Sequence, residues 1–342
     1  MAELDNLHIY ILTRIEGRIC TNVFYHLTKG CTGDKINIII DLPCPRAGGA
    51  SPARSLRTER KDVRMQLGIR AHDCKGETFE ELIGNIKAQG LKCIQLAPGK
   101  AIKEFVTDRC AMTPGMALYV KRVMAKADMD VAVLGCYLNL GTPDKDELAN
   151  TTAIYRSHIR FASLLGCGVV GTETGAVNTS YSYEEANGSD EALEVFINNL
   201  RPVVEYAEKL GVIVALECVW SHIVCNVQRM RKVLDTIDSP NLQVIYDPIN
   251  TFRPGETVDQ EAMMQEAFDL LGDDIAAIHI KDFVIEDGKI VPAEMGKGIF
   301  RFDVLMKWLK ERKPLIHVLM EETTPENSEA ARDFVLEQYA KA

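Results

Sequence analysis

The sequence predicts an α/β protein built as a closed parallel (β/α)8 barrel, and three observations point to this fold. From residue 65 to the C-terminus, short apolar runs alternate in strict order with stretches of helical period. Four of the later runs end in Glu, Asp or His at intervals that suit strand-helix units. No Gly-x-Gly-x-x-Gly follows the first strand, which argues against an open dinucleotide-binding sheet. The 342 residues exceed the roughly 250 that such a barrel needs.

The expected strands are runs of apolar and β-branched residues. The run 275–282 (IAAIHIKD) is typical, because five apolar residues and then His279, Lys281 and Asp282 indicate a buried parallel strand whose carboxyl end opens into a site. In order, the expected strands are 66–72, 92–97, 130–135, 168–173, 212–217, 242–247, 275–282 and 315–321.

Eight helices are expected between and after these strands. Gly90 and Gly211 end two of them, since glycine readily takes the left-handed conformation at a helix end. Thr142 is the expected N-cap of a third, with Pro143 at its first helical position. In order, the expected helices are 77–90, 113–127, 144–165, 190–210, 226–237, 257–271, 302–312 and 327–340.

Residues 1–64 differ from the rest of the chain. They carry 10 Lys/Arg and 7 Asp/Glu, whereas residues 65–342 carry 29 and 42. Their only strand-like run, 35–41, leads into a Pro- and Gly-rich stretch, 42–54, and no helical period is found. Residues 59–62 (ERKD) have codons that can be almost wholly purine, like a bacterial ribosome-binding site. We hypothesise that residues 1–64 are largely an untranslated leader that has been read as protein, and that Met65 is the true start. The alternative is a weakly ordered N-terminal extension before a barrel domain of residues 65–342.

Composition favours a cytoplasmic protein with a small-molecule substrate. The formal net charge of −10 argues against a nucleic-acid partner, because such partners normally require a basic face. No apolar run approaches the roughly 18 to 20 residues of a membrane span, and no signal-peptide pattern is found. None of the ten cysteines forms a Cys-x-x-Cys pair. Several lie in or beside apolar runs, which is typical of reduced core thiols, namely Cys93, Cys136, Cys167 and Cys218.

Four residues that end consecutive predicted strands form the candidate metal site: Glu217, Asp247, His279 and Glu321. They are separated by 30, 32 and 42 residues, and the carboxyl ends of parallel strands meet at one mouth of a barrel. Alternate strand residues face the interior. By this parity Glu321 points inward, whereas the adjacent Glu322 points the other way.

Three carboxylates at one mouth would repel strongly unless a cation neutralised them. Three oxygen ligands and one imidazole suit a single divalent ion, most of all Mn²⁺, with Mg²⁺ or Co²⁺ as alternatives, and leave positions open for substrate oxygens. The competing interpretation is four unrelated polar groups that cap the helices after their strands.

Further polar residues are candidates for substrate contact at the same mouth, each with a structural alternative such as a salt bridge, a packed ring or a turn. They are His222, Lys281, Asn250, Glu173, Tyr137 and Asn139. His72 is a weaker candidate because a strand-end histidine can cap a helix. His158 and His317 are interpreted as structural, and Trp220 and Phe252 as core packing rather than as an apolar wall of a binding site.

Together with residues 279–282 (HIKD) and 296–299 (GKGI), the four strand-ending residues resemble the sugar phosphate isomerase/epimerase family, whose fold is the xylose isomerase-like TIM barrel. Ketose 3-epimerases, inosose dehydratases and hydroxypyruvate isomerases belong to that superfamily. The resemblance covers residues 65–342. It implies that the four residues bind one divalent metal and that Glu217 and Glu321 also act as the acid/base pair. Residues 247–250 (DPIN) place Asn250 where ketose 3-epimerases have a substrate-binding His.

The leading functional hypothesis is a metal-dependent epimerase or isomerase of a sugar or sugar derivative, acting through a metal-stabilised enediolate. The alternative is a lyase or dehydratase that expels a leaving group from a keto-sugar or inosose, including carbon-glycoside cleavage with a partner subunit. A DNA-repair endonuclease would need more His ligands and a basic groove, but strand two ends in Ala97-Pro98 and strand three leads into residues 137–139 (YLN). A non-catalytic sugar-binding barrel remains open, as does assembly into a homo-oligomer.

Overall fold

The computed structural model describes residues 14–15, 18–19, 65–256 and 259–342. The chain divides into two units, Met1–Glu59 and Arg60–Ala342. In the first unit, β1 (Arg14–Ile15) pairs antiparallel with β2 (Arg18–Ile19), a pairing that the sequence did not predict. The predicted run 35–41 lies outside the described residues, as does most of the segment concerned by the start-site hypothesis.

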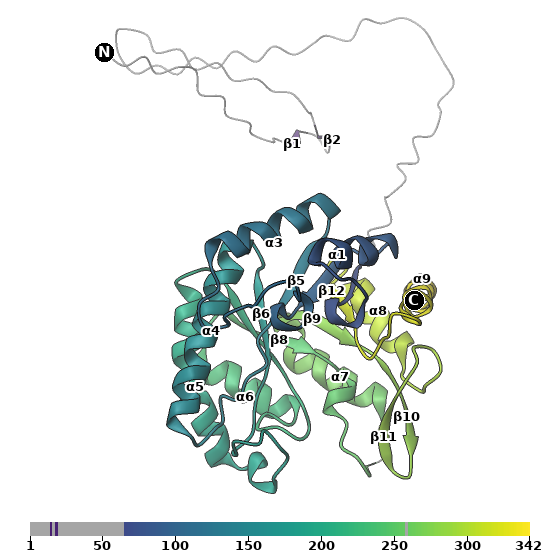
Figure 1. Ribbon diagram of the computed structural model, residues 1–342. Helices are drawn as coiled ribbons and strands as arrows, with labels where there is room; N and C mark the ends of the chain where they lie inside the picture. Colours follow the sequence, from purple (N-terminus) through teal and green to yellow (C-terminus); the bar gives the residue numbers. More distant parts are fainter. Residues whose placement is uncertain (1–13, 16–17, 20–64, 257–258) are drawn as a thin grey trace, which may run out of the picture. The chain divides into compact units, whose positions relative to one another are not determined.

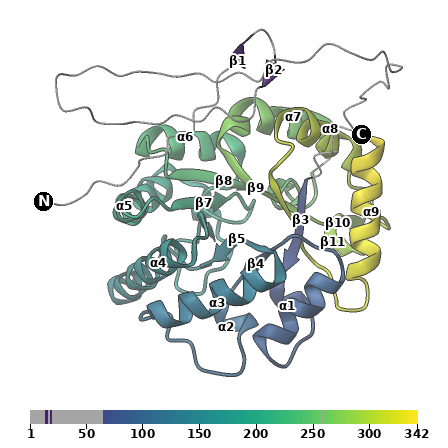
Figure 2. The same ribbon diagram turned by 90° about the horizontal axis from the view of Figure 1, so that it is seen from above.

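The second unit is a closed barrel of parallel strands, which confirms the predicted fold class. The barrel closes because the last strand, β12, pairs with both β9 and β3. Figure 2 shows the ring of helices around these strands. The barrel strands are β3 (Gln66–Arg70), β4 (Cys93–Leu96), β5 (Asp130–Gly135), β6 (Val169–Glu173), β7 (Ile213–Glu217), β8 (Leu242–Tyr246), β9 (Ile275–Ile280) and β12 (His317–Met320).

Each predicted helix has an observed counterpart in the outer layer (Figure 1). The predicted start of the third helix was wrong. The N-cap of α4 is Asp144, whose carboxylate accepts hydrogen bonds from the backbone N–H groups of Asp146 and Glu147, while the Thr142 hydroxyl donates to the Glu147 carboxylate. A carboxylate is at least as good a cap as a hydroxyl, so the helix begins two residues later. The helices are α1 (Phe79–Ala88), α3 (Pro114–Ala127), α4 (Lys145–Leu165), α5 (Asp190–Glu208), α6 (Val227–Ile237), α7 (Gln260–Leu271), α8 (Phe302–Arg312) and α9 (Ser328–Lys341).

The first and the eighth predicted strands were too long. The first strand ends at Arg70, and Ala71–Asp73 forms a 3-10 turn instead. The eighth begins at His317, whereas Leu315 is 63% exposed and precedes the strand. The sequence also did not predict the short helix α2 (Pro98–Ala101), nor the other 3-10 turns, Glu185–Gly188, Ile249–Thr251 and Gly272–Asp274.

A hairpin that the sequence did not predict follows the seventh barrel strand. The expected strand 275–282 stops at Ile280, and Asp282 begins the antiparallel pair β10 (Asp282–Glu286) and β11 (Lys289–Ala293). The buried Asp282 carboxylate holds the returning chain, because it accepts hydrogen bonds from the backbone N–H groups of Gly296, Gly298 and Phe300 as well as Phe283. A Cβ at Gly298 would collide with this carboxylate, so the chain can pass there only as glycine.

The core has two layers, as strand parity predicts. Ala215 and Leu319 lie in the small cluster that fills the barrel interior, whereas Val214 and Leu216 belong to the larger cluster between strands and helices. Phe252 is fully buried and packs on Phe283, in line with the predicted core role. The cysteines predicted as core thiols are buried and free, namely Cys93, Cys136, Cys167 and Cys218.

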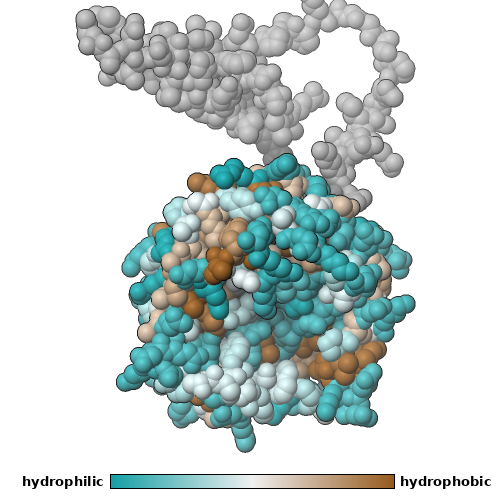
Figure 3. Space-filling model, in the orientation of Figure 1, coloured by the Kyte–Doolittle hydropathy of each residue, from teal (hydrophilic) through white to brown (hydrophobic). Residues whose placement is uncertain are grey.

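On the face shown in Figure 3, hydrophobic residues form separate patches on a mainly hydrophilic surface. Among the described helices, none combines the length and the apolar character that crossing a membrane requires.

Candidate active site

The structure brings the four predicted metal ligands together at the carboxyl ends of consecutive barrel strands. Glu217 ends β7, Asp247 directly follows β8, His279 lies near the end of β9, and Glu321 directly follows β12. All four are buried, with exposures between 0% and 7%. One potential ligand atom from each lies within 4.8 Å of those of the other three.

His279 lies between the two glutamates of this cluster. Its Nδ1 is 3.2 Å from Oε2 of Glu217 and 3.2 Å from Oε1 of Glu321. Burial alone would lower the pKa of His279, but the charges of Glu321 and Glu217 outweigh it and raise the pKa to about 9. Its Nε2 is buried and has no hydrogen-bond partner among the described residues. The two carboxylates therefore favour the protonated imidazole, whose positive charge balances theirs.

Two further cations, one from the end of β9 and one from the end of β3, lie beside the cluster. Lys281 Nζ lies 2.7 Å from Oδ2 of Asp247 and 3.4 Å from Oε2 of Glu321. Arg70 ends β3, and its Nη1 lies 3.7 Å from Oε1 of Glu321. Burial would raise the pKa of Glu321, but His279, Lys281 and Arg70 lower it to about 2. Arg70 was not predicted as a site residue, because the predicted first strand continued to residue 72 and did not end at Arg70.

Asn250 links two of these charged groups. Its side-chain carbonyl accepts a hydrogen bond of 2.7 Å from Lys281, and its Nδ2 donates one of 2.6 Å to Oε1 of Glu217. Its backbone N–H donates to Oδ1 of Asp247, which fixes the 3-10 turn that follows β8. Besides His279, which both glutamates share, the carboxylate of Glu217 therefore has an uncharged donor, whereas that of Glu321 faces Lys281 and Arg70.

The donor set fits a divalent metal ion. Three carboxylates and one imidazole are typical ligands of hard or borderline divalent cations, and no thiol lies in the cluster. The imidazole that now balances the carboxylates as a cation would bind a metal in its neutral form, with the metal supplying the positive charge instead. The buried Glu/Asp/His cluster can thus hold one divalent ion.

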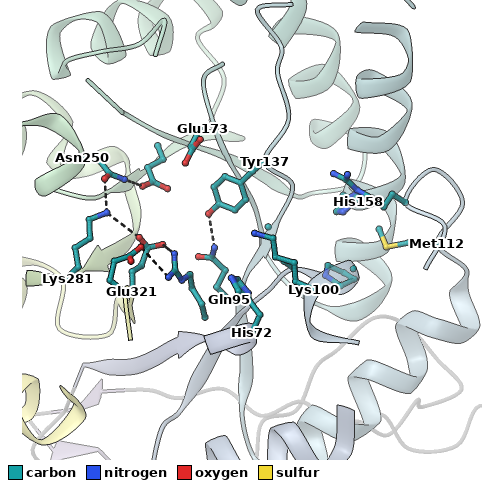
Figure 4. Close-up of a pocket in the computed structure, with 18 residues that line it drawn as sticks. His72, Gln95, Lys100, Met112, Tyr137, His158, Glu173, Asn250, Lys281 and Glu321 are labelled. Carbon is teal, nitrogen blue, oxygen red and sulfur yellow. Dashed lines mark hydrogen bonds and ion pairs between the residues drawn. The ribbon is translucent and has the colours of Figure 1, made fainter. Parts of the chain in front are cut away.

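The cluster opens into a cavity of ≈ 590 Å³ at the mouth of the barrel, within the size range of small-molecule sites. Figure 4 shows Glu321, Lys281 and Asn250 on one side of it and Met112 and His158 on the other. Both Glu217 and Glu321 belong to its wall. Substrate atoms in the cavity would therefore meet both carboxylates.

Four of the predicted substrate contacts line this cavity: Lys281, Asn250, Tyr137 and Glu173. The Tyr137 hydroxyl accepts a hydrogen bond of 2.9 Å from Gln95 Nε2. Glu173 accepts one of 3.0 Å from the Tyr181 hydroxyl, and burial, followed by the charge of Glu217, raises the pKa of Glu173 to about 7.

The other two predicted contacts are not in the cavity wall. His222 lies behind Glu173, 3.7 Å from its carboxylate, and its ring packs on Tyr181. Asn139 is buried in a turn, where its Oδ1 accepts hydrogen bonds from the backbone N–H groups of Gly141 and Ala176. An asparagine that forms a turn and one that faces a ligand look the same in sequence, which is why Asn139 could not be placed beforehand.

Several cavity residues were not predicted. His158, interpreted as structural, lies on α4 and lines the cavity while its Nδ1 bonds the Ile154 carbonyl. His317, also interpreted as structural, lies 3.8 Å from the Asp130 carboxylate. The unpredicted wall residues with polar side chains are Arg70, Gln95, Lys100, Arg109 and Glu322, and the weak candidate His72 joins them.

A comparison with protein families matches residues 83–338 to the family described as xylose isomerase-like TIM barrel. The chain belongs to this family. The resemblance inferred from the strand-ending residues is thereby confirmed, and the match spans most of the barrel from α1 to α9.

Solved structures with this xylose isomerase-like barrel show the same fold at low identity. A 3-keto-D-glucoside 4-epimerase from E. coli has 15% identity and a TM-score of 0.62, over 81% of this chain and 100% of that one. An L-ribulose 3-epimerase has 14% identity and a TM-score of 0.63, over 81% and 95%. An IolI protein with a bound zinc atom has 14% identity and a TM-score of 0.63, over 81% and 99%. A comparison with curated protein sequences gave no match.

Proposed function

We propose that this protein is a divalent-metal-dependent epimerase or isomerase of a sugar or sugar derivative. The observation that carries the proposal is that Glu217 and Glu321 line one cavity and also belong to the buried cluster with Asp247 and His279. The sugar epimerases among the proteins of like fold support a carbohydrate as the substrate class.

The four cluster residues would hold the ion, and Mn²⁺ is the ion we favour, with Mg²⁺ or Co²⁺ also suited to three oxygens and one nitrogen. A bound divalent cation supplies Lewis-acid stabilisation of the negative charge that develops on neighbouring substrate oxygens as a carbon-bound proton leaves. The zinc atom in the IolI structure supports a metal ion in a barrel of this fold.

Glu217 and Glu321 move the proton in this proposal. They come from β7 and from the residue after β12, and β8 and β9 lie between those strands in the barrel, so they approach a substrate from different sides. One carboxylate removes the proton from the carbon beside the carbonyl, and the other returns a proton to the opposite face. Asn250 orients Glu217, and Lys281 and Arg70 hold Glu321.

Four other wall residues orient the sugar. Tyr137 and Glu173 offer a hydroxyl and a carboxyl group to substrate hydroxyls, and Lys281 and Asn250 offer donors beside the cluster. His222 and Asn139 act from behind the wall, by supporting Glu173 and the turn at Gly141.

The test is hydrogen exchange with solvent. The purified protein with Mn²⁺ is incubated in D₂O with a panel of ketoses, inososes and 3-keto-sugars, and NMR follows each substrate. We expect deuterium at a carbon next to the carbonyl together with an epimer or isomer. An elimination product would replace the proposal with the lyase or dehydratase alternative. Tight metal binding without exchange in any sugar would make the protein a binding barrel instead.

We also infer a reducing, cytoplasmic location, since the barrel contains free buried thiols such as Cys93 and Cys136. A homo-oligomer, or a complex with a partner subunit, is the assembly to look for by light scattering of the purified protein and of cell extracts.

A further inference from the structure

The cavity continues beyond the carboxylate cluster into an outer arm with different chemistry. Lys100 comes from the short helix α2, and Arg109 from the connection between α2 and α3. Met112 and His158 lie beside them in the wall. In Figure 4, Lys100 lies between the Tyr137–Gln95 pair and the side occupied by Met112 and His158. A substrate anchored at the cluster would thus direct its far end toward this arm.

The two cations of the outer arm differ from those at the cluster in having no charged partner. Lys281 and Arg70 each form ion pairs with carboxylates of the site. Within the described part of the chain, neither Lys100 nor Arg109 forms an ion pair or a side-chain hydrogen bond. These two positive charges line a cavity in a barrel unit that is otherwise rich in acidic residues.

The acidic residues nearest in sequence to Lys100 and Arg109 form hydrogen bonds with other groups. Glu104 accepts hydrogen bonds from the backbone N–H of Phe79 and from the Tyr119 hydroxyl. Asp108 accepts one from the backbone N–H of Cys110, and this contact closes the turn that carries Arg109. The turn is held in place further on, where the Met112 N–H donates to the Ser157 hydroxyl of α4. The outer arm therefore presents its cations on an ordered segment.

The nearby histidines add no further charge. Burial, and then the charges of Arg70 and Lys100, lower the pKa of His72 to about 4. Burial likewise lowers the pKa of His158 to about 4, and Arg109 contributes to this. Because the Nδ1–H of His158 donates to the Ile154 carbonyl, its Nε2 is left as an acceptor for a hydroxyl. The positive charge of the arm comes from Lys100 and Arg109 alone.

We propose that the outer arm is a subsite for an anionic group, a carboxylate or a phosphate, at the end of the substrate remote from the metal cluster. An ammonium group and a guanidinium group with free donors suit such oxygens, and charge-assisted hydrogen bonds to them are strong. The inference rests on the proposed function, since it assigns the substrate class as sugar acids or sugar phosphates rather than neutral sugars.

The experiment compares matched sugars on the full chain with Mn²⁺. Isothermal titration calorimetry measures Kd for D-fructose, D-fructose 6-phosphate and D-fructuronate, at low and at high salt. The variants are Lys100→Gln, Arg109→Gln and the charge-conserving Arg109→Lys. Lys103→Gln is the matched control, because Lys103 is exposed in the same segment but is not part of the cavity wall.

We expect at least one anionic sugar to bind at least about tenfold more tightly than D-fructose, and salt to weaken that preference. Lys100→Gln and Arg109→Gln should each remove most of the preference and leave the Kd of D-fructose unchanged. Arg109→Lys and Lys103→Gln should retain it. Whichever of D-fructose 6-phosphate and D-fructuronate has the lower Kd identifies the anion that the outer arm binds.

The subsite is overturned if neither anionic sugar binds better than D-fructose, or if the Gln variants weaken all three sugars by the same factor. Solvent deuterium exchange on the same samples separates this result from the proposed function. A preference that depends on Lys100 and Arg109, without exchange in any sugar, would keep the subsite and remove the isomerase chemistry. Deuterium exchange without a preference for an anionic sugar would keep the isomerase chemistry and remove the subsite.

Discussion

Asn250 donates a hydrogen bond of 2.6 Å to the carboxylate of Glu217, although the two residues follow different barrel strands. The same amide accepts a hydrogen bond from Lys281, so it has no freedom to turn. Asn250→Ala should leave Glu217 without its donor and lower turnover roughly 10- to 100-fold, as when support for metal ligands is lost. Asn250→Asp should be worse, because it places a like charge beside Glu217. Steady-state kinetics with metal content measured in parallel checks this, and unchanged turnover in both variants would contradict it.

Metal binding should depend on all four cluster residues. We expect His279→Ala and Asp247→Ala to weaken Mn²⁺ binding by an order of magnitude or more, because each removes one of four converging ligands. The measurements are metal content after dialysis and Kd by calorimetry. Glu322→Gln is the control, since Glu322 is adjacent to Glu321 but lies outside the cluster. Normal stoichiometry and affinity in both Ala variants would remove the metal assignment.

Proton transfer should fail when either glutamate loses its basic oxygen. Glu→Gln is nearly isosteric and keeps one oxygen for a metal, but an amide does not accept the proton. Glu217→Gln and Glu321→Gln should therefore retain metal and lose turnover by at least about a hundredfold. If exchange at the substrate carbon survives in one variant while epimerisation stops, that glutamate is the one that returns the proton. Full turnover in both variants would exclude two-base chemistry.

Stability should belong to the barrel domain, residues 65–342. All eight barrel strands and their helices lie in that range, and Met65 itself is buried in the core. A chain that begins at Met65 is therefore expected to unfold at the same temperature as the full chain. Differential scanning calorimetry of the two proteins measures it. A drop of more than a few degrees for the shorter chain would mean that residues before Met65 contribute to the fold.

The free energy of unfolding should fall as the pH is lowered from about 6.5 to about 4. Burial lowers the pKa of His158 from its usual 6.5 to about 4, so the unfolded chain binds this proton first as the pH falls. Above the pKa of His158 in the unfolded chain, its contribution to the free energy of unfolding is fully present. That contribution, about 3 kcal/mol, is lost as the pH falls to the pKa in the folded chain. Urea unfolding at several pH values should show a shallower decline for His158→Gln than for the wild type. Equal slopes would show that His158 is not buried as a neutral ring.

Local patterns in the sequence were enough to predict the barrel and the buried Glu/Asp/His cluster. Each cluster residue lies at the end of an apolar strand with inward parity, so Glu217 and Glu321 could be chosen without knowing the packing. The rest of the cavity wall depends on tertiary structure. Lys100 lies on a four-residue helix, Arg109 lies in a turn, and His158 faces the cavity from a long helix. None of these has a periodic signal that would place it beside a strand end.

The hydrogen bonds between Asp282 and the returning chain fix both ends of the β10–β11 hairpin at the barrel, which matters for protein engineering. The excursion leaves next to Lys281 and returns through Gly296, Gly298 and Phe300, all bound to one carboxylate. The turn at the far end of the hairpin makes a contact outside it, because the Gly288 carbonyl accepts a hydrogen bond from the Gly255 N–H in the loop after β8. Extra residues or a fluorescent label inserted at that turn would disturb this loop contact, while Asp282 would keep the spacing of the strand ends as it is.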